Sequence, residues 1–259
     1  MWFGCYTDGF CYAIFDGHLK QIVKYHSFEV PDFYQVRSTT FQEFLDGIDV
    51  FINDFKSIKI VFENPFYTLM PAALFDEDEA SSYFNLKYSL VETDQLLNQR
   101  IPDFGAQIIY SVQKHILNLL LSKFTESSIR ERLKVYHHAH ALLSGLYYQT
   151  NHLNTEVCYV NLCEKTFDVV LIKNSGLHFC NTYNFNNPVD VLYFVMHAYH
   201  SNQLNPEVYD CYVSGKNTHL MEIKALLFTY IKNIRDIELM HVPSPGIHSS
   251  TLFLLQHCV

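Results

Sequence analysis

Residues 157–172 read VCYVNLCEKTFDVVLI, and this stretch decides how the chain folds. Two runs rich in β-branched residues, Val157–Leu162 and Phe167–Ile172, lie on either side of a predicted turn at Cys163–Lys165, which predicts an antiparallel pair of strands. The turn residues Asn174-Ser-Gly176 then predict a third strand at Leu177–Phe185. This part of the chain is therefore expected to form a three-stranded meander.

A helix and two further strands are predicted after this meander. Asn187 and Pro188 are typical of the start of a helix, because asparagine caps free N–H groups and proline suits the first turn. The apolar residues predicted on one face of this helix are Val189, Leu192, Tyr193, Met196 and Tyr199. The pattern continues with a strand at Val208–Val213, a helix at about Thr218–Lys232 and a short strand near Ile237–Met240.

The beginning of the chain repeats this order. Residues 2–28 contain three strand-like runs separated by Asp8-Gly9 and Asp16-Gly17, dipeptides that favour tight hairpin turns. A capping box at Thr40–Glu43 predicts the start of a helix, and Ile58–Phe62 predicts a buried strand. The apolar face of this helix is expected to contain Phe41, Phe44, Leu45, Ile48, Ile52 and Phe55. An internal repeat of this kind predicts two α/β units of one architecture.

The region between the repeats completes the first half. The elements predicted there are strands at Gln107–Val112 and Leu133–His137 and helices at about Gln113–Phe124 and Ala139–Tyr148. The acidic residues Asp76–Glu79 predict the solvated first turn of a helix. We place the boundary at the polar break Asn151–Asn154, which gives lobes at residues 1–152 and 153–259, with residues 243–259 left unassigned.

Composition restricts the function classes. Of the 259 residues, 49% are apolar and 17% are charged, which predicts a folded chain, and the net charge of -9 argues against nucleic-acid binding. The odd number of cysteines, seven, without a C-x-x-C motif predicts buried thiols in a reducing compartment. The N-terminus lacks a secretory signal, and no apolar run is long enough to cross a membrane. We therefore expect a cytoplasmic protein.

The predicted duplicated βββαβα plan resembles the ribonuclease H-like fold of actin, sugar kinases and heat-shock-70 ATPases, which has two lobes and a cleft. Residues 161–172, NLCEKTFDVVLI, resemble the second phosphate loop of heat-shock-70 chaperones, DLGGGTFDV followed by apolar residues. The matching residues are Leu162, Thr166, Phe167, Asp168 and Val169. Asn161 replaces the aspartate of that loop, and the three residues Cys163–Lys165 replace its three glycines.

Two further segments fall where this family has nucleotide-binding motifs. Residues 211–218, CYVSGKNT, resemble the adenosine motif, with Gly215 retained from its glycine pair and Ser214 in the place of the other. The segment Tyr6-Thr-Asp-Gly-Phe10 stands where the first phosphate loop is expected and is short for that purpose. The resemblance implies a degenerate nucleotide site at Asp8, Gly9, Asn161, Thr166, Asp168, Ser214 and Gly215.

A closer resemblance is to an uncharacterised Bacteroidetes family, domain-of-unknown-function family 3822, with an actin-like ATPase fold. The opening meander, residues 66–75 (FYTLMPAALF) and the strand Ile108–Val112 followed by Gln-Lys and a Leu-rich helix are similar to that family. No established activity comes with this resemblance.

Loss of the glycines predicts weak or absent hydrolysis of nucleotide. Side chains at residues 163–165 obstruct the approach of phosphate to backbone N–H groups, Glu164 adds a negative charge, and Asn161 lacks the charge that Mg²⁺ favours. The leading interpretation is a pseudo-ATPase that acts as a binding or scaffold module for a protein partner. The alternative is an atypical ATPase or small-molecule kinase that would use ATP and Mg²⁺ in the inter-lobe cleft, with Asp8 as the candidate catalytic carboxylate.

Several residues have two interpretations. Asp8 either replaces the catalytic or metal-site aspartate or belongs to a hairpin turn, and Asp168 either contacts a ligand or faces solvent beside the cleft. Lys216 either contacts a phosphate or is solvated. A third class, a histidine-dependent metalloenzyme, would use His137, His138 and His140, or His197 and His200. Successive strand residues point to opposite faces, so we predict that His137 and His138 do not share one ion and that the chain has no metal site.

Overall fold

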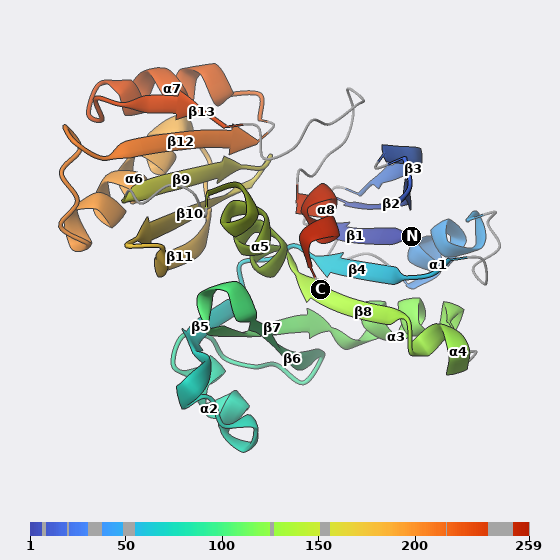
Figure 1. The fold of residues 1–259 in the computed structure, drawn as a ribbon. Coiled ribbons are helices and arrows are strands. Elements are labelled where there is room, and N and C mark those ends of the chain that lie inside the picture. Colours follow the sequence, from blue (N-terminus) through green and yellow to red (C-terminus); the bar gives the residue numbers. More distant parts are fainter. Residues whose placement is uncertain are drawn as a thin grey trace. The chain divides into compact units, whose positions relative to one another are not determined.

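Two five-stranded sheets with the same strand order form the framework of the chain (Figure 1). The computed structural model describes residues 1–6, 9–19, 21–30, 38–48, 55–124, 127–150, 156–215, 217–237 and 251–258. Contacts divide the chain into a first unit, Met1–Ala141, and a second unit, Leu142–Val259, each with one of these sheets. The predicted boundary at residues 151–154 lies outside the described residues, so the lobe limits 1–152 and 153–259 stay predictions.

The sheet of the first unit contains the predicted meander. Its strands are β1 (Trp2–Tyr6), β2 (Gly9–Asp16), β3 (Gln21–Glu29), β4 (Ile58–Phe62) and β8 (Leu133–His137). They lie in the order β3-β2-β1-β4-β8. The three strands of the meander pair antiparallel, whereas β1, β4 and β8 pair parallel. The predicted bounds of β4 and β8 are confirmed.

The two hairpin turns of this meander differ from the prediction. Gly9 pairs with Tyr6, so Gly9 is a strand residue rather than a turn residue, while Asp8 lies outside the described residues. A Cβ atom at Gly9 would collide with the carbonyl oxygen of Phe28, which explains the glycine through strand packing. Asp16 pairs with Gln21, so the second connection contains four residues instead of two. The Asp16 carboxylate accepts N–H bonds from the next loop residues, His18 and Leu19, at 2.8 and 3.0 Å.

The first helix, α1 (Ser38–Asp46), starts earlier than predicted. Thr40 therefore lies inside the helix, and the predicted capping box is wrong. The predicted apolar face is confirmed at Phe41, Phe44 and Leu45, which are buried. The helix ends at Asp46, so buried Ile48 and half-buried Phe55 lie beyond it, and Ile52 lies outside the described residues. The centroid of the Phe44 ring lies 4.3 Å from that of Phe10 of β2, so aromatic packing fixes the helix on the sheet.

A second, three-stranded sheet is inserted between β4 and β8, with strand order β5-β7-β6. The elements of this insertion are β5 (Tyr67–Pro71), α2 (Ala80–Asn85), β6 (Asp94–Ile101), β7 (Ala106–Gln113), α3 (Lys114–Lys123) and α4 (Ser127–Arg130), with short 3-10 turns at Ala72–Leu74, Glu77–Glu79 and Pro102–Phe104. The acidic residues predicted for the first turn of a helix form a 3-10 turn directly before α2, which Asp76 caps by accepting the N–H of Asp78 at 3.1 Å.

The sheet of the second unit repeats the topology of the first. Its strands are β9 (Val157–Leu162), β10 (Thr166–Lys173), β11 (Gly176–Asn184), β12 (Asp210–Gly215) and β13 (Ile234–Asp236). They lie in the order β11-β10-β9-β12-β13, with an antiparallel meander and a parallel β9-β12-β13 group. The last described strand ends directly before the predicted position near Ile237–Met240, and residues 238–240 of that prediction lie outside the described residues. The predicted duplication is confirmed.

Helices α6 (Pro188–Ser201) and α7 (Leu220–Phe228) pack on this sheet. The predicted cap of α6 is confirmed, because the Asn187 side chain accepts the N–H groups of Val189 and Asp190 at 3.0 and 3.1 Å. Of the predicted apolar face, Tyr199 is buried and Leu192 and Met196 are partly buried against the core, whereas Val189 and Tyr193 are exposed. The residues that α6 buries are Pro188, Val191, Val195, Ala198 and Tyr199. The remaining helices are α5 (His138–Thr150), which crosses the boundary of the two units, and the short α8 (Thr251–Leu254), followed by a 3-10 turn at Leu255–His257.

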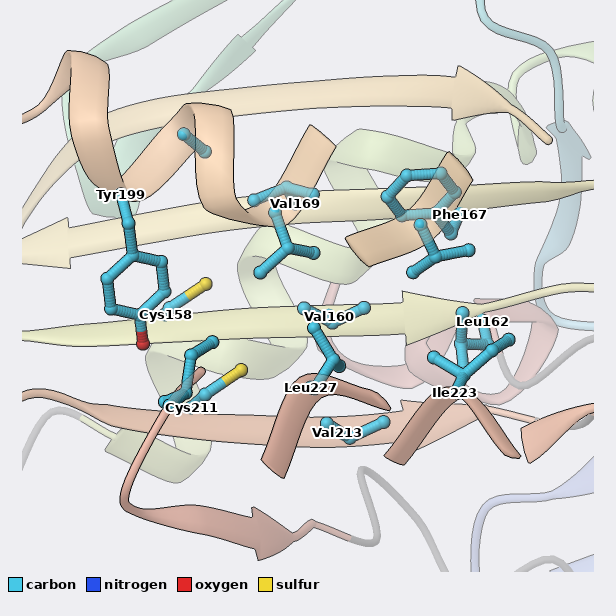
Figure 2. Packing of buried hydrophobic residues seen from close by; sticks show 14 of the residues in the cluster. Cys158, Val160, Leu162, Phe167, Val169, Tyr199, Cys211, Val213, Ile223 and Leu227 are labelled. Carbon is cyan, nitrogen blue, oxygen red and sulfur yellow. The ribbon is translucent and has the colours of Figure 1, made fainter. Parts of the chain in front are cut away.

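The core of the second unit lies between its sheet and these two helices (Figure 2). Alternate residues of β9 and β10, including Val160, Leu162 and Phe167, point toward Ile223 and Leu227 of α7 or toward α6. Burial excludes these side chains from water and provides the main stabilisation of the unit. Residues 161 and 168 therefore point to the opposite face of the sheet, since side chains alternate along a strand.

Candidate functional site

Four polar residues lie in register across β11, β10, β9 and β12. Asp168 pairs with Thr182 on one side and with Asn161 on the other, and Asn161 also pairs with Ser214. We call Thr182, Asp168, Asn161 and Ser214 the polar ladder. Two of its members, Asn161 and Ser214, stand near the carboxyl ends of neighbouring parallel strands, which is where open α/β sheets commonly bind ligands.

Hydrogen bonds connect the polar ladder from end to end. Asp168 Oδ1 accepts from Thr182 Oγ1 at 2.6 Å, and Asp168 Oδ2 accepts from Asn161 Nδ2 at 3.0 Å. Asn161 Oδ1 accepts from Ser214 Oγ at 3.1 Å. The exposed fraction is 1% for Asp168 and Asn161 and below 9% for the other two. Each carboxylate oxygen of buried Asp168 therefore accepts a hydrogen bond from a neighbouring strand, which offsets the free-energy cost of removing the carboxylate from water.

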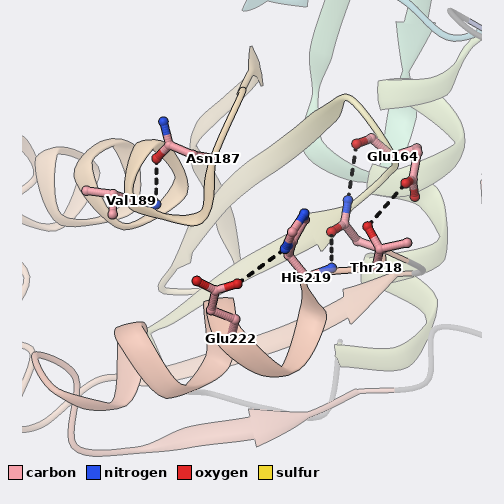
Figure 3. A network of polar contacts seen from close by, with 7 residues as sticks. Glu164, Asn187, Val189, Thr218, His219 and Glu222 are labelled. Atoms are coloured by element: carbon pink, nitrogen blue, oxygen red, sulfur yellow. Dashed lines mark hydrogen bonds and ion pairs between the residues drawn. The ribbon is translucent and has the colours of Figure 1, made fainter.

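The turn between β9 and β10 is closed by its own hydrogen bonds. The N–H of Cys163 donates to the carbonyl oxygen of Thr166 at 2.9 Å. Asn217 Nδ2 donates to the carbonyl oxygens of Cys163 and Glu164, at 2.7 and 3.2 Å. Thr218 Oγ1 donates to Glu164 Oε1 at 3.3 Å (Figure 3). A phosphate loop instead directs backbone N–H groups at its ligand. Hydrogen bonds thus hold the turn between β9 and β10 against the segment after β12.

Thr166 and Gly215 complete the group of predicted residues in the second unit. Thr166 is the buried first residue of β10, and its carbonyl group closes the turn. Gly215, the last residue of β12, has φ of +105°, a region that L side chains rarely adopt. A Cβ atom there would collide with the backbone of Leu162. The close approach of β12 to β9 is therefore sufficient to explain why residue 215 is glycine.

The structure brings together five of the seven predicted nucleotide-site residues: Asn161, Thr166, Asp168, Ser214 and Gly215. Gly9 belongs to β2 of the first unit, and Asp8 and Lys216 lie outside the described residues. Sequence reasoning missed Thr182 and Asn217. The signal for Thr182 was the short predicted turn at residues 174–176, which brings the strand after it back along β10. In the structure a register shift between Leu171 and Ile172 sets Thr182 opposite Asp168.

The histidine cluster of the first unit consists of His137, His138 and His140. The prediction that His137 and His138 point to opposite faces is wrong, because His137 ends β8 and His138 begins α5, and their ring centroids are 4.4 Å apart. His137 Nε2 donates to the carbonyl oxygen of Asn64 at 3.0 Å, and Nδ1 accepts the N–H of Ala139 at 3.2 Å. Both ring nitrogens of neutral His137 thus have partners. Within the described ranges, no three His, Cys, Asp or Glu residues are grouped as a metal site requires.

These buried histidines predict loss of stability in acid. Burial, and to a smaller extent the Lys59 ammonium group, lowers the pKa of His140 to about 4, and burial lowers the pKa of His137 well below its usual value. The unfolded chain, with a histidine pKa of about 6.5, therefore binds more protons below that pH. We expect the free energy of unfolding to fall by about 3 kcal/mol for His140 between pH 6.5 and 4.

The test is urea unfolding of the first unit across this pH range. His140→Phe keeps a ring against Tyr136, whose centroid is 5.2 Å away, and should reduce proton uptake on unfolding by about one proton. The control is His219→Gln, since the His219 side chain is 54% exposed. An unchanged pH slope in His140→Phe would contradict the interpretation.

Comparisons with known proteins agree with the fold. The family described as protein of unknown function (DUF3822) matches residues 3–234, and no curated protein matches. A Bacteroides thetaiotaomicron protein with an actin-like ATPase fold and unknown function has a TM-score of 0.80 at 16% identity, covering 91% of this chain and 90% of that chain. The PilM-PilN type IV pilus biogenesis complex gives a TM-score of 0.59 at 11% identity, covering 92% and 87%.

These likenesses confirm the predicted actin-like ATPase fold. A third structure, the cytoplasmic domain of EpsL, an inner membrane component of the type II secretion system of Vibrio cholerae, has a TM-score of 0.49 at 9% identity and covers 99% and 93%. Among the described helices, none combines the length and the apolar character needed to span a membrane.

Proposed function

This chain belongs to the DUF3822 family of proteins of unknown function, and from that premise we propose that it is a degenerate actin-like ATPase-fold protein that acts as a cytoplasmic binding or scaffold module. Its hydrolysis of nucleotide is weak or absent. The observation that carries the proposal is the polar ladder, in which both carboxylate oxygens of Asp168 accept hydrogen bonds from the protein itself.

Phosphoryl transfer needs backbone donors around the phosphates and a carboxylate that holds hydrated Mg²⁺. In the second unit, the Cys163 N–H is bonded within its turn, and the exposed Glu164 places negative charge on that turn. The side-chain amide of Asn161 connects two strands. ATP and Mg²⁺ would have to break these contacts before they could bind, so their binding would be weak.

A protein partner is the second part of the proposal. PilM, which shares the fold, occurs with PilN in a complex of type IV pilus biogenesis, so this fold can serve in a protein assembly. Six of the seven cysteines are buried, and no disulfide joins any of them in the part of the chain that the structure describes, which suits a reducing compartment such as the cytoplasm.

Thermal unfolding with and without millimolar Mg-ATP tests the proposal. We expect no ATP-dependent change in Tm and no release of inorganic phosphate, whereas a ligand present at 100 times its Kd would add about 2.7 kcal/mol of stability. The matched variant is Asp168→Asn, which keeps the shape of the side chain and removes its charge. An increase in Tm or phosphate release in the wild type that Asp168→Asn abolishes would instead establish the atypical ATPase.

A further inference from the structure

Two cysteines occupy paired positions on neighbouring strands of the second unit. Cys158 of β9 and Cys211 of β12 are register partners in a parallel pair, and neither side chain is exposed. Both side chains point to the core face of the sheet, where the two thiols hydrogen-bond each other (Figure 2). We call Cys158 and Cys211 the thiol pair. Both are free thiols in the structure.

The register of the thiol pair suits a disulfide bond. Neighbouring strands lie about 4.8 Å apart, and the two Cα atoms of a disulfide are about 4.4–6.8 Å apart. Cys5 of β1 and Cys11 of β2 also lie on neighbouring strands, but Cys5 pairs with Phe10 and Cys11 pairs with Gly4. Since successive residues of a strand point to opposite faces, Cys5 and Cys11 point away from each other. Strand register therefore distinguishes the thiol pair from these two cysteines.

The packing around the thiol pair limits which oxidised products the folded unit can contain. Tyr199 of α6 is 1% exposed, and its hydroxyl group is hydrogen-bonded to the same thiols (Figure 2). A disulfide between the two sulfur atoms adds no atom to this core and removes two hydrogen atoms. A glutathione group on either sulfur has no room, because protein cores are close-packed. The closed unit thus accepts the two thiols or their disulfide and excludes a mixed disulfide.

We propose that Cys158 and Cys211 form a redox modification site, at which a low-molecular-weight disulfide such as glutathione disulfide converts the two thiols into one disulfide bond. The first exchange takes place while the sheet is transiently open, since both sulfur atoms are buried. The thiolate of one cysteine attacks a sulfur of glutathione disulfide, and one glutathione leaves with the electrons of the broken S–S bond. The thiolate of the other cysteine then attacks the protein sulfur of this mixed disulfide and releases the second glutathione. The protein loses two protons and two electrons, which the two glutathione thiols gain.

This disulfide would connect the two central strands of the parallel group. The polar ladder joins the same strands through Asn161 and Ser214, which lie three residues beyond Cys158 and Cys211. A covalent link restricts the unfolded chain, so we expect the oxidised second unit to unfold at a higher temperature than the reduced unit. The stability of the second unit would then depend on the thiol–disulfide balance of its surroundings.

Peptide mass mapping of the full chain after incubation with glutathione disulfide tests this proposal. The incubation is made at a urea concentration just below the unfolding transition, where openings are frequent, and the remaining thiols are then alkylated. We expect peptides linked through Cys158 and Cys211, lighter by two hydrogen atoms than the reduced pair. The linked protein, returned to buffer without urea, should have a higher Tm, which dithiothreitol reverses.

Two variants sharpen the test. Cys211→Ser should stop at a mixed disulfide on Cys158, and the modified variant should lose native circular dichroism because the glutathione group prevents closure. The matched control is Cys180→Ser. Cys180 pairs in register with Val170 rather than with a cysteine, so this variant should form the same link as the wild type.

The outcomes separate the proposal from its alternatives. A wild type that keeps glutathione on Cys158 or Cys211, that links either one to another cysteine, or that leaves both reduced overturns the proposal. A linked protein with an unchanged or lower Tm contradicts the stabilising effect of the bond. The result is independent of the Mg-ATP experiment, which concerns the polar ladder.

Discussion

Gly215→Ala should destabilise the second unit by about 3–5 kcal/mol, the range of the most severe single substitutions. Two causes act together at this position. Its φ of +105° disfavours any L side chain, and the new Cβ would collide with backbone atoms of Leu162, which cannot rotate away as a flexible side chain can. The strands β9 and β12 would have to separate at their carboxyl ends.

Substitutions at two other glycines distinguish the cost of the positive φ from the cost of the Cβ collision. Gly105 has φ of +58° with no atom within 4 Å of a new Cβ, so Gly105→Ala should cost only the backbone term of about 1–2 kcal/mol. Gly17 has neither a positive φ nor a close atom, and Gly17→Ala should be almost neutral. Hydrogen exchange at the amides of β9 and β12 would measure the effect of Gly215→Ala on the second unit. A Gly215→Ala protein as stable as Gly17→Ala would show that the strand ends are not packed as described.

Asp168→Ala should destabilise the second unit by about 4 kcal/mol. This change removes the buried carboxylate that accepts from the Asn161 amide and from the Thr182 hydroxyl, and the loss of such an acceptor in a buried site costs about 1–3 kcal/mol for each donor. Asp168→Asn should cost much less, because an asparagine can still accept from Asn161 and donate to the Thr182 hydroxyl. A larger loss of stability in Asp168→Ala than in Asp168→Asn is expected if the hydrogen bonds of the polar ladder stabilise the sheet.

A double-mutant cycle sharpens this test. Thr182→Val alone should cost about 1–2 kcal/mol, and combined with Asp168→Ala it should cost less than the sum, because the hydroxyl that loses its acceptor is gone. Urea unfolding followed by hydrogen exchange in β10 would measure all three variants. Strictly additive costs would show that Asp168 and Thr182 do not interact in the folded chain.

The order of strands and helices could be predicted because each element has its own periodicity. Short apolar runs with polar ends fixed the bounds of β4, β8 and β9, and their repetition predicted two sheets of one topology. The buried face of α6 could not be chosen in this way, because Val189 and Val191 are equally apolar on opposite sides of one helix. Only the packing of the sheet decides between them. The strands β5 and β6 were missed, since residues such as Gln95, Asn98 and Gln99 weaken the apolar pattern of β6.

The sequence was sufficient to predict which residues belong to the candidate site, but not the hydrogen bonds that they form. The match to a phosphate loop led to Asn161, Thr166 and Asp168, which indeed lie together. Thr182, which donates to Asp168, comes from a strand with no such match and reaches the site through strand register. Asn217 lies in the segment that resembles the adenosine motif, but its bond to the turn after β9 is a loop contact that this match does not predict. These partners are defined by tertiary structure, which a motif comparison does not contain.

Neighbouring strands of the second unit place two thiols next to each other in its core. Cys158 of β9 and Cys211 of β12 are paired in register, and both are fully buried (Figure 2). Hydrogen bonding with the neighbouring Cys211 thiol, followed by burial, raises the pKa of the Cys158 thiol, so little of it is the reactive thiolate. An alkylating reagent can reach either sulfur only when the sheet opens. The rate at which these two thiols are modified, followed by mass spectrometry, therefore measures how often the second unit opens, without an introduced label.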